Sequence, residues 1–70
     1  LESMELHRSR GSYRVQRIDD QSLRLINPDG EALESRVSHE GVLESDDTRA
    51  THPYVAALLQ EACVGLGLRP

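Results

Sequence analysis

The segment LRLINPDGEAL most tightly constrains the fold of this chain, because both its turn and its flanks favour a β-hairpin. Pro28 presets φ at the second position of a type I turn, and Asp29 suits the third position. Gly30 can adopt the left-handed conformation that the fourth position requires in a three-residue hairpin loop. The segment therefore predicts two antiparallel strands, near 22–27 and 31–38.

The three-residue loop sets the register of this hairpin, and the side chains agree with that register. Leu25 falls opposite Leu33, and Arg24 falls opposite Glu34, so apolar and oppositely charged neighbours meet across the strands. A shift of one residue would turn every side chain of one strand to the other face of the sheet. The same register places Ile26 opposite Ala32 and Leu23 opposite Ser35.

A third strand is predicted over 12–18, because SYRVQRI has strand composition and the polar connector DDQS leads from it to the hairpin. The three segments form an antiparallel meander in which odd-numbered residues face the core. Arg17 and Ser35 are polar exceptions toward the edges of that face. The apolar residues predicted on the core face are Tyr13, Val15, Leu23, Leu25, Leu33 and Val37.

A C-terminal helix is predicted over about 52–64, with Thr51 as its N-cap and Pro53 in its first turn. Gly65 or Gly67 would supply the left-handed residue that ends the helix. Its apolar residues have the spacing of one buried stripe, as in a helix that lies on a sheet. This stripe consists of Val55, Leu58, Leu59, Ala62, Cys63 and Leu66.

Residues 1–11 show no clear period, so we expect an N-terminal arm in which Met4 and Leu6 either pack or stay mobile. Residues 1–3 precede the methionine, and the simplest interpretation is a cloning remnant. Residues 12–70 are then expected to form a single small domain.

The predicted fold class is α+β, with a three-stranded antiparallel meander packed against one C-terminal helix. Residues 39–45 add either a short fourth strand or a loop. A chain of 70 residues has one core, and without Trp or Phe this core relies on Leu, Val and Ile with two tyrosines. Such a core supplies little stability, so we expect the chain to self-associate or to assemble with another subunit.

The net charge of -4 disfavours a general nucleic-acid or membrane-surface protein, whose electrostatic footprint is basic. The average hides an asymmetry, since 7–17 carries four arginines and no acid, while 40–47 carries four acids and no base. The one cysteine, Cys63, has no disulfide partner within the chain, and no apolar run approaches the length of a transmembrane helix. We therefore expect a cytoplasmic protein with no membrane partner.

No residue spacing predicts a metal site, a cofactor site or an active site. The three histidines and Cys63 do not form CxxC or HxxxH patterns, so no metal is expected. Ser38, His39 and Glu40 are triad residue types, but a catalytic triad depends on geometry rather than on adjacency. We predict no enzyme activity; only a composite site between subunits would change this.

The even-numbered face of the sheet is the predicted partner-binding surface. It mixes cations with apolar side chains, namely Arg14, Ile18, Arg24, Ile26 and Arg36. Val64 and Leu68 are also expected to be exposed, and the edges of the sheet offer unpaired strands. These features favour a small non-enzymatic protein–protein interaction module, such as an accessory subunit, adaptor or docking domain, that forms a homodimer. The alternative is a small nucleic-acid-associated regulatory protein that uses the arginine-bearing face as a dimer.

Overall fold

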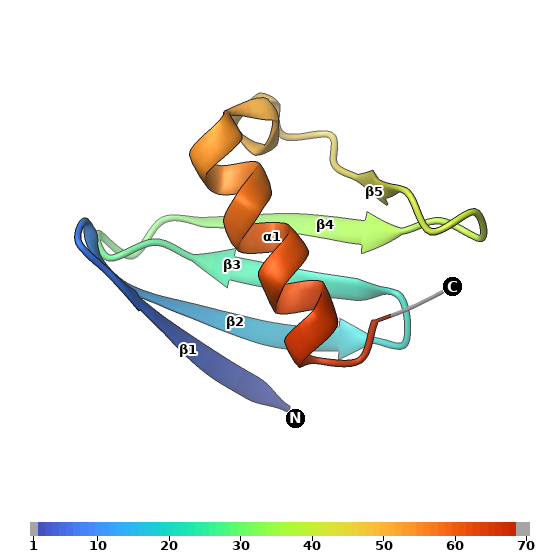
Figure 1. Ribbon diagram of the computed structural model, residues 1–70, viewed down its shortest axis with the longest axis horizontal. Helices are drawn as coiled ribbons and strands as arrows, with labels where there is room; N and C mark the ends of the chain where they lie inside the picture. Colours follow the sequence, from blue (N-terminus) through green and yellow to red (C-terminus); the bar gives the residue numbers. More distant parts are fainter. Residues whose placement is uncertain (1, 69–70) are drawn as a thin grey trace.

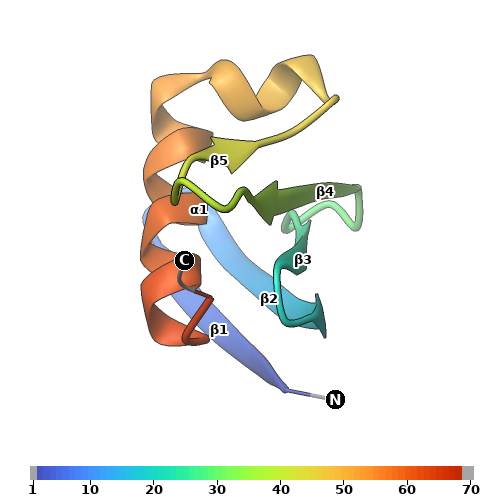
Figure 2. The ribbon, with the colours of Figure 1, turned by 90° about the vertical axis from the view of Figure 1, so that its right-hand side faces the viewer.

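A five-stranded antiparallel sheet with one helix on one face makes up the computed structural model, which describes residues 2–68 (Figure 1). The strands follow one another across the sheet in chain order, so the connectivity is a simple meander. Figure 2 shows the helix and the sheet as two layers. The elements are β1 (Ser3–Arg8), β2 (Gly11–Asp19), β3 (Ser22–Ile26), β4 (Ala32–Val37), β5 (Leu43–Glu44), the 3-10 helix η1 (Thr48–Thr51) and α1 (Pro53–Gly65).

The central hairpin has the predicted loop and register. Leu25 lies opposite Leu33, and Arg24 lies opposite Glu34. The Asn27 N–H donates to the Glu31 carbonyl at 2.7 Å and closes the three-residue loop. Within that loop Gly30 has φ +92°, the left-handed conformation that glycine adopts most readily. The α+β meander packed against a C-terminal helix is confirmed.

The core lies between the odd-numbered face of the sheet and the apolar stripe of α1, as predicted. Ser35 is buried within it, and its hydroxyl donates to the Glu44 carbonyl at 2.8 Å, so the polar group is satisfied. All six predicted sheet residues are buried, together with five of the helix stripe, while Val55 is half-buried. These buried residues are Tyr13, Val15, Leu23, Leu25, Leu33, Val37, Leu58, Leu59, Ala62, Cys63 and Leu66.

Of the two alternatives for residues 1–11, packing of Met4 and Leu6 is the one realised, and the separate arm is wrong for 3–8 because these residues form strand β1 against β2. Leu6 lies opposite Tyr13 and is only 5% exposed, while Met4 lies opposite Val15 and is half-buried. Two apolar residues are too few to show a period, but they suffice to place one face of a strand on an existing core. Ser3, within the stretch interpreted as a cloning remnant, lies opposite Gln16; Leu1 is outside the described residues.

The helix begins one residue later than predicted, and its N-cap is His52 rather than Thr51. The His52 Nδ1 atom accepts a hydrogen bond from the Tyr54 N–H at 3.2 Å. Pro53 explains the difference, because a residue before proline is driven into an extended conformation, here φ -64° and ψ 131°. Thr51 instead ends η1, where its hydroxyl donates to the Thr48 carbonyl at 2.8 Å.

Gly67, with φ +72°, ends α1 and turns the chain back onto the core. The Leu68 N–H donates to the Cys63 carbonyl at 2.9 Å, and the Gly67 N–H donates to the Val64 carbonyl at 3.2 Å. This is a Schellman arrangement, in which the residue after the glycine packs against the last turn. Leu68 is therefore only 2% exposed, and the expectation that it would be exposed is wrong.

Residues 39–45 contain a short strand as well as a turn. β5 pairs with the end of β4, with Val37 opposite Leu43 and Arg36 opposite Glu44. Gly41 has φ +82° in the turn that precedes it. The strand and the loop that were predicted as alternatives for 39–45 are therefore both present, and the strand forms a two-residue edge of the sheet.

Replacing Gly67 with alanine should lower the free energy of unfolding by about 1–2 kcal/mol. An added Cβ would find room, since its nearest neighbour is Arg17 Nη2 at 3.7 Å, so the cost comes from the positive φ alone. Urea denaturation followed by circular dichroism measures the change. The control Gln60→Ala, at an exposed position of the same helix, should change stability by less than about 0.5 kcal/mol. Equal stability of Gly67→Ala and the parent would contradict the assigned helix end.

Candidate interaction surfaces

The residues predicted to bind a partner lie on or beside the sheet face opposite α1. Arg14 lies directly opposite Ile26 across β2 and β3, whereas Arg24 and Arg36 lie in separate cross-strand rows. Ile18 sits at the end of β2, where the register shifts between Arg17 and Asp19, and it is 40% exposed. The structure therefore brings Arg14 and Ile26 together and spreads the other residues along the sheet.

Each of the three arginines on this face forms an ion pair with a glutamate of a neighbouring strand. Arg24 Nη2 lies 2.8 Å from Glu34 Oε2. Arg14 pairs with Glu5 at 3.0 Å, and Arg36 pairs with Glu44 at 3.5 Å. Exposed pairs of this kind contribute little to stability, but they balance the local charge. The face is thus a series of neutral pairs rather than a cationic field that would attract nucleic acid.

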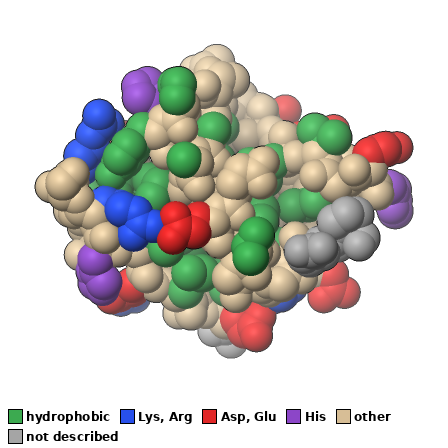
Figure 3. Space-filling model, in the orientation of Figure 1, with side chains coloured by type: hydrophobic (Ala, Val, Ile, Leu, Met, Phe, Trp, Pro, Cys, Tyr) green, Lys and Arg blue, Asp and Glu red, His purple; other side chains and the backbone are tan. Residues whose placement is uncertain are grey.

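A second surface is the outward side of α1, where only the exposure of Val64 was predicted from the sequence. We call it the helix face; its exposed residues are Pro53, Ala57, Gln60, Glu61 and Val64. Glu61 is the one charged residue of this set, and Arg8 Nη2 binds its carboxylate at 2.5 Å. Val64 is 67% exposed. Figure 3 shows this side of the molecule, with hydrophobic side chains around a pair of opposite charges. The sequence indicates this surface in one way, because the helical residues 53–65 include a single charged side chain, Glu61.

Strand β1 forms one edge of the sheet, and no described strand pairs with its outer side. The Arg17 N–H donates to the Glu2 carbonyl at 2.9 Å, which shows that residue 2 directs its backbone toward β2. Because backbone directions alternate along an antiparallel strand, Ser3, Glu5 and His7 direct their N–H and C=O groups outward. The ion pair between Arg8 and Glu61 joins this edge to the helix face.

A groove lies between the turn that follows β1, the turn between β3 and β4, and the start of α1. It has a volume of about 460 Å³ and is lined by Arg10, Leu33, His52 and Val55, among others. The Arg10 guanidinium lies 4.1 Å from the centre of the Tyr54 ring, a cation–π contact.

The same ring also faces Tyr13, with the two ring centres 6.1 Å apart. Burial first, and the neighbouring Tyr54 second, raise the pKa of Tyr13. The Tyr54 hydroxyl is buried without a hydrogen-bond partner among the described residues. The two rings therefore pack β2 against the first turn of α1, next to the hairpin turns.

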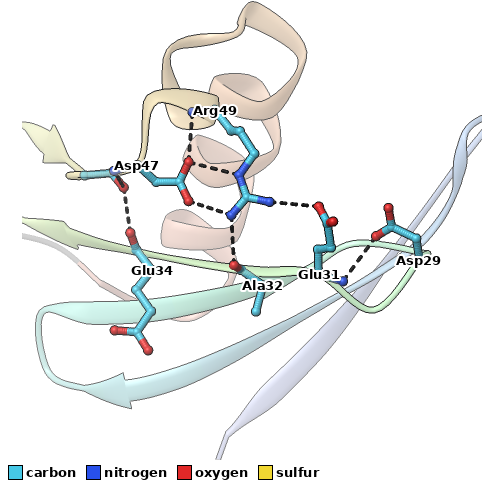
Figure 4. Close-up of polar contacts among 7 residues, drawn as sticks. Asp29, Glu31, Ala32, Glu34, Asp47 and Arg49 are labelled. Carbon is cyan, nitrogen blue, oxygen red and sulfur yellow. Dashed lines mark hydrogen bonds and ion pairs between the residues drawn. The ribbon is translucent and has the colours of Figure 1, made fainter.

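Arg49 fastens η1 to the central hairpin (Figure 4). Its guanidinium binds both carboxylate oxygens of Asp47, at 2.9 and 2.6 Å. It also donates to Glu31 Oε1 and to the Ala32 carbonyl, both at 3.0 Å. The side-chain hydrogen bond from Arg49, followed by the bond from its backbone N–H, lowers the pKa of Asp47 to about 2. This cluster holds the chain between β5 and α1 against the sheet.

Residues 2–68 contain no group of three His, Cys, Asp or Glu side chains placed to hold a metal ion. Burial raises the pKa of the Cys63 thiol, which keeps the thiol protonated and weakens it as a nucleophile. In the part of the chain that the structure describes, no helix has the length and hydropathy needed to cross a bilayer. Comparison of the sequence and structure with protein families, curated proteins and solved structures finds no match.

Replacing Asp47 with asparagine should destabilise the protein at neutral pH but not near pH 2. The carboxylate has a pKa of about 2 when folded and an ordinary value of 3.8, so its stabilising effect is present above about pH 4. That effect is lost as the pH falls through the folded pKa. Asparagine can still accept the hydrogen bond from the Arg49 N–H, so the variant removes mainly the charge.

Thermal unfolding of both proteins between about pH 6 and about pH 2 measures this difference in midpoint. The control Asp46→Asn removes the same charge one residue away and should leave the midpoint nearly unchanged at every pH. A constant difference between Asp47→Asn and the parent across this range would contradict the assigned ion pair.

Proposed function

We propose that this chain is a small non-enzymatic protein–protein interaction module that binds its partner through the helix face and the adjoining edge of β1. The observation that carries the proposal is the near absence of charge on the outward side of α1. The sheet covers only one side of α1. Its outward side carries a single charged residue, whereas a helix side that stays in water normally carries several charged and polar residues. Val64, at 67% exposed, is the most exposed large apolar residue on this surface.

The one charged pair on the helix face supports the same proposal. Arg8 and Glu61 neutralise each other at 2.5 Å, so a partner would not need to cover an isolated charge. By contrast, the outer sheet face is occupied by three exposed Arg–Glu pairs, whose side chains would have to lose water on binding. We therefore place the binding surface on the helix side rather than on the predicted residues Arg14, Ile18, Arg24, Ile26 and Arg36.

The small size of the core also supports association. Thirteen apolar residues are buried among residues 2–68, none of them Trp or Phe, and a core of this kind gives only a small free energy of unfolding. Covering the helix face would add buried apolar area and stabilise the folded state by mass action. The proposal includes a cytoplasmic setting, which the single buried cysteine Cys63 supports.

Val64→Asp should weaken capture of partner proteins about tenfold, because a charge placed in an apolar interface must be buried without a partner. The chain, carrying an affinity tag, is used to capture proteins from an extract of the organism that encodes it, and mass spectrometry quantifies them. Ile18→Asp is the matched control, since it introduces the same charge at an exposed apolar residue on the other side of the sheet.

Circular dichroism must show that both variants are folded. Loss of capture with Val64→Asp and retention with Ile18→Asp would support the helix face. Retention of capture with Val64→Asp and loss with Ile18→Asp would instead identify the outer sheet face as the binding surface. Capture of nucleic acid alone would contradict an interaction module and favour the regulatory alternative.

A further inference from the structure

We infer that β1 pairs with β1 of a second copy of this chain, antiparallel and centred on Leu6, so that the two sheets join into one. This inference rests on the proposed function and names the partner of its edge strand. In the joined sheet Glu5 of each copy lies opposite His7 of the other. Three observations lead to this arrangement: the state of the two sheet edges, the direction of the β1 backbone, and the charges along β1.

The two edges of the sheet differ in their capacity to pair. β5 has only two residues, and such short edge strands resist further pairing. β1 has six residues and contains no proline. Its one arginine, Arg8, forms an ion pair with Glu61 of α1, so its charge does not extend past the edge where it would oppose the addition of a strand. β1 is therefore the edge at which a further strand can add.

Symmetry and backbone direction limit the possible registers. In an antiparallel pair, residues directly opposite each other lie on the same face. The two-fold axis must therefore pass midway between one residue of β1 and the same residue of the second copy. Axes at Glu5 and at Leu6 both keep five residues of each strand in register, 3–7 or 4–8, within the bounds of β1. Both use the outward backbone groups of Glu5 and His7, which β2 leaves free.

The charges distinguish these two registers. An axis at Glu5 places the two Glu5 carboxylates directly opposite each other, which is unfavourable. An axis at Leu6 places Glu5 opposite His7 twice, once on each side of the axis. These groups already lie close together within one copy, where Glu5 Oε1 is 3.7 Å from His7 Nε2, and both side chains are at least 48% exposed. Their other contacts, from Glu5 to Arg14 and from His7 to Ser12, lie on the side of β2 and leave the outer side of β1 open. The register centred on Leu6 is therefore favoured.

A proline scan along β1 tests the pairing. Glu5→Pro removes an outward N–H that the second copy needs, while every hydrogen bond to β2 is kept. Ser3→Pro is the matched control, because it removes an outward N–H that lies beyond the paired residues 4–8. Sedimentation velocity from micromolar to millimolar protein measures the mass against the 7.8 kDa of one chain. We expect dimers for the parent and for Ser3→Pro, and monomers for Glu5→Pro.

A charge exchange tests the register without proline. His7→Glu places like charges opposite each other and should raise the dimer dissociation constant about tenfold. The double variant Glu5→His with His7→Glu again places one carboxylate opposite one imidazole on each side of the axis and should recover the parent value to within about threefold. A double variant no tighter than His7→Glu would overturn the register, and so would a monomeric Ser3→Pro.

A monomeric parent at all concentrations would overturn the inference itself. If that monomer still captures other proteins in a manner that depends on Val64, the proposed function stands and only the β1 pairing fails. If the parent is a dimer that responds to Glu5→Pro, the pairing is supported even where Val64→Asp has no effect on capture. The two failures are thus distinguishable.

Discussion

The opposition of Leu25 to Leu33 is the contact on which the remaining structure depends. Val15 continues this apolar row on β2 and Met4 continues it on β1, so one line of side chains crosses four strands. Leu59 of α1, which is fully buried, belongs to the same hydrophobic cluster. A slip of one residue at the hairpin would turn half of this row away from the helix. The turn at Pro28 therefore controls the core through the register that it imposes.

The parts of the fold that could be predicted are those that neighbouring residues determine. Turn chemistry specified the hairpin, and helical spacing specified the buried stripe of α1. The missing parts depend on contacts between distant residues. β1 is a strand because β2 offers Met4 and Leu6 a place beside Val15 and Tyr13, which no local pattern reveals. Leu68 is buried because Gly67 reverses the chain, and the direction of that reversal depends on the core beneath it.

The candidate surface was harder to predict for the same reason. The arginines of the outer sheet face were placed beside the correct strands, and the pairing of Arg24 with Glu34 followed from the hairpin register. The partners of Arg14 and Arg36 come from β1 and β5. No strand was predicted over the residues of β1, and a strand over 39–45 was only one of two alternatives. When these glutamates are left out, the face has a net positive charge. When they are included, the charges of its arginines are neutralised. Of the helix face, only the exposure of Val64 was predicted, because its other residues, such as Ala57 and Gln60, are common on the solvent side of any helix.

Arg17 shows how the two ends of the described chain are held together. Its guanidinium binds the Glu2 carboxylate at 2.5 Å and also donates to the Leu66 carbonyl at the end of α1. One side chain of β2 thus spans the start of the first strand and the end of the last helix. Loss of the Arg17 side chain would therefore free the start of β1 and the end of α1 at the same time, although these two segments lie at opposite ends of the described residues.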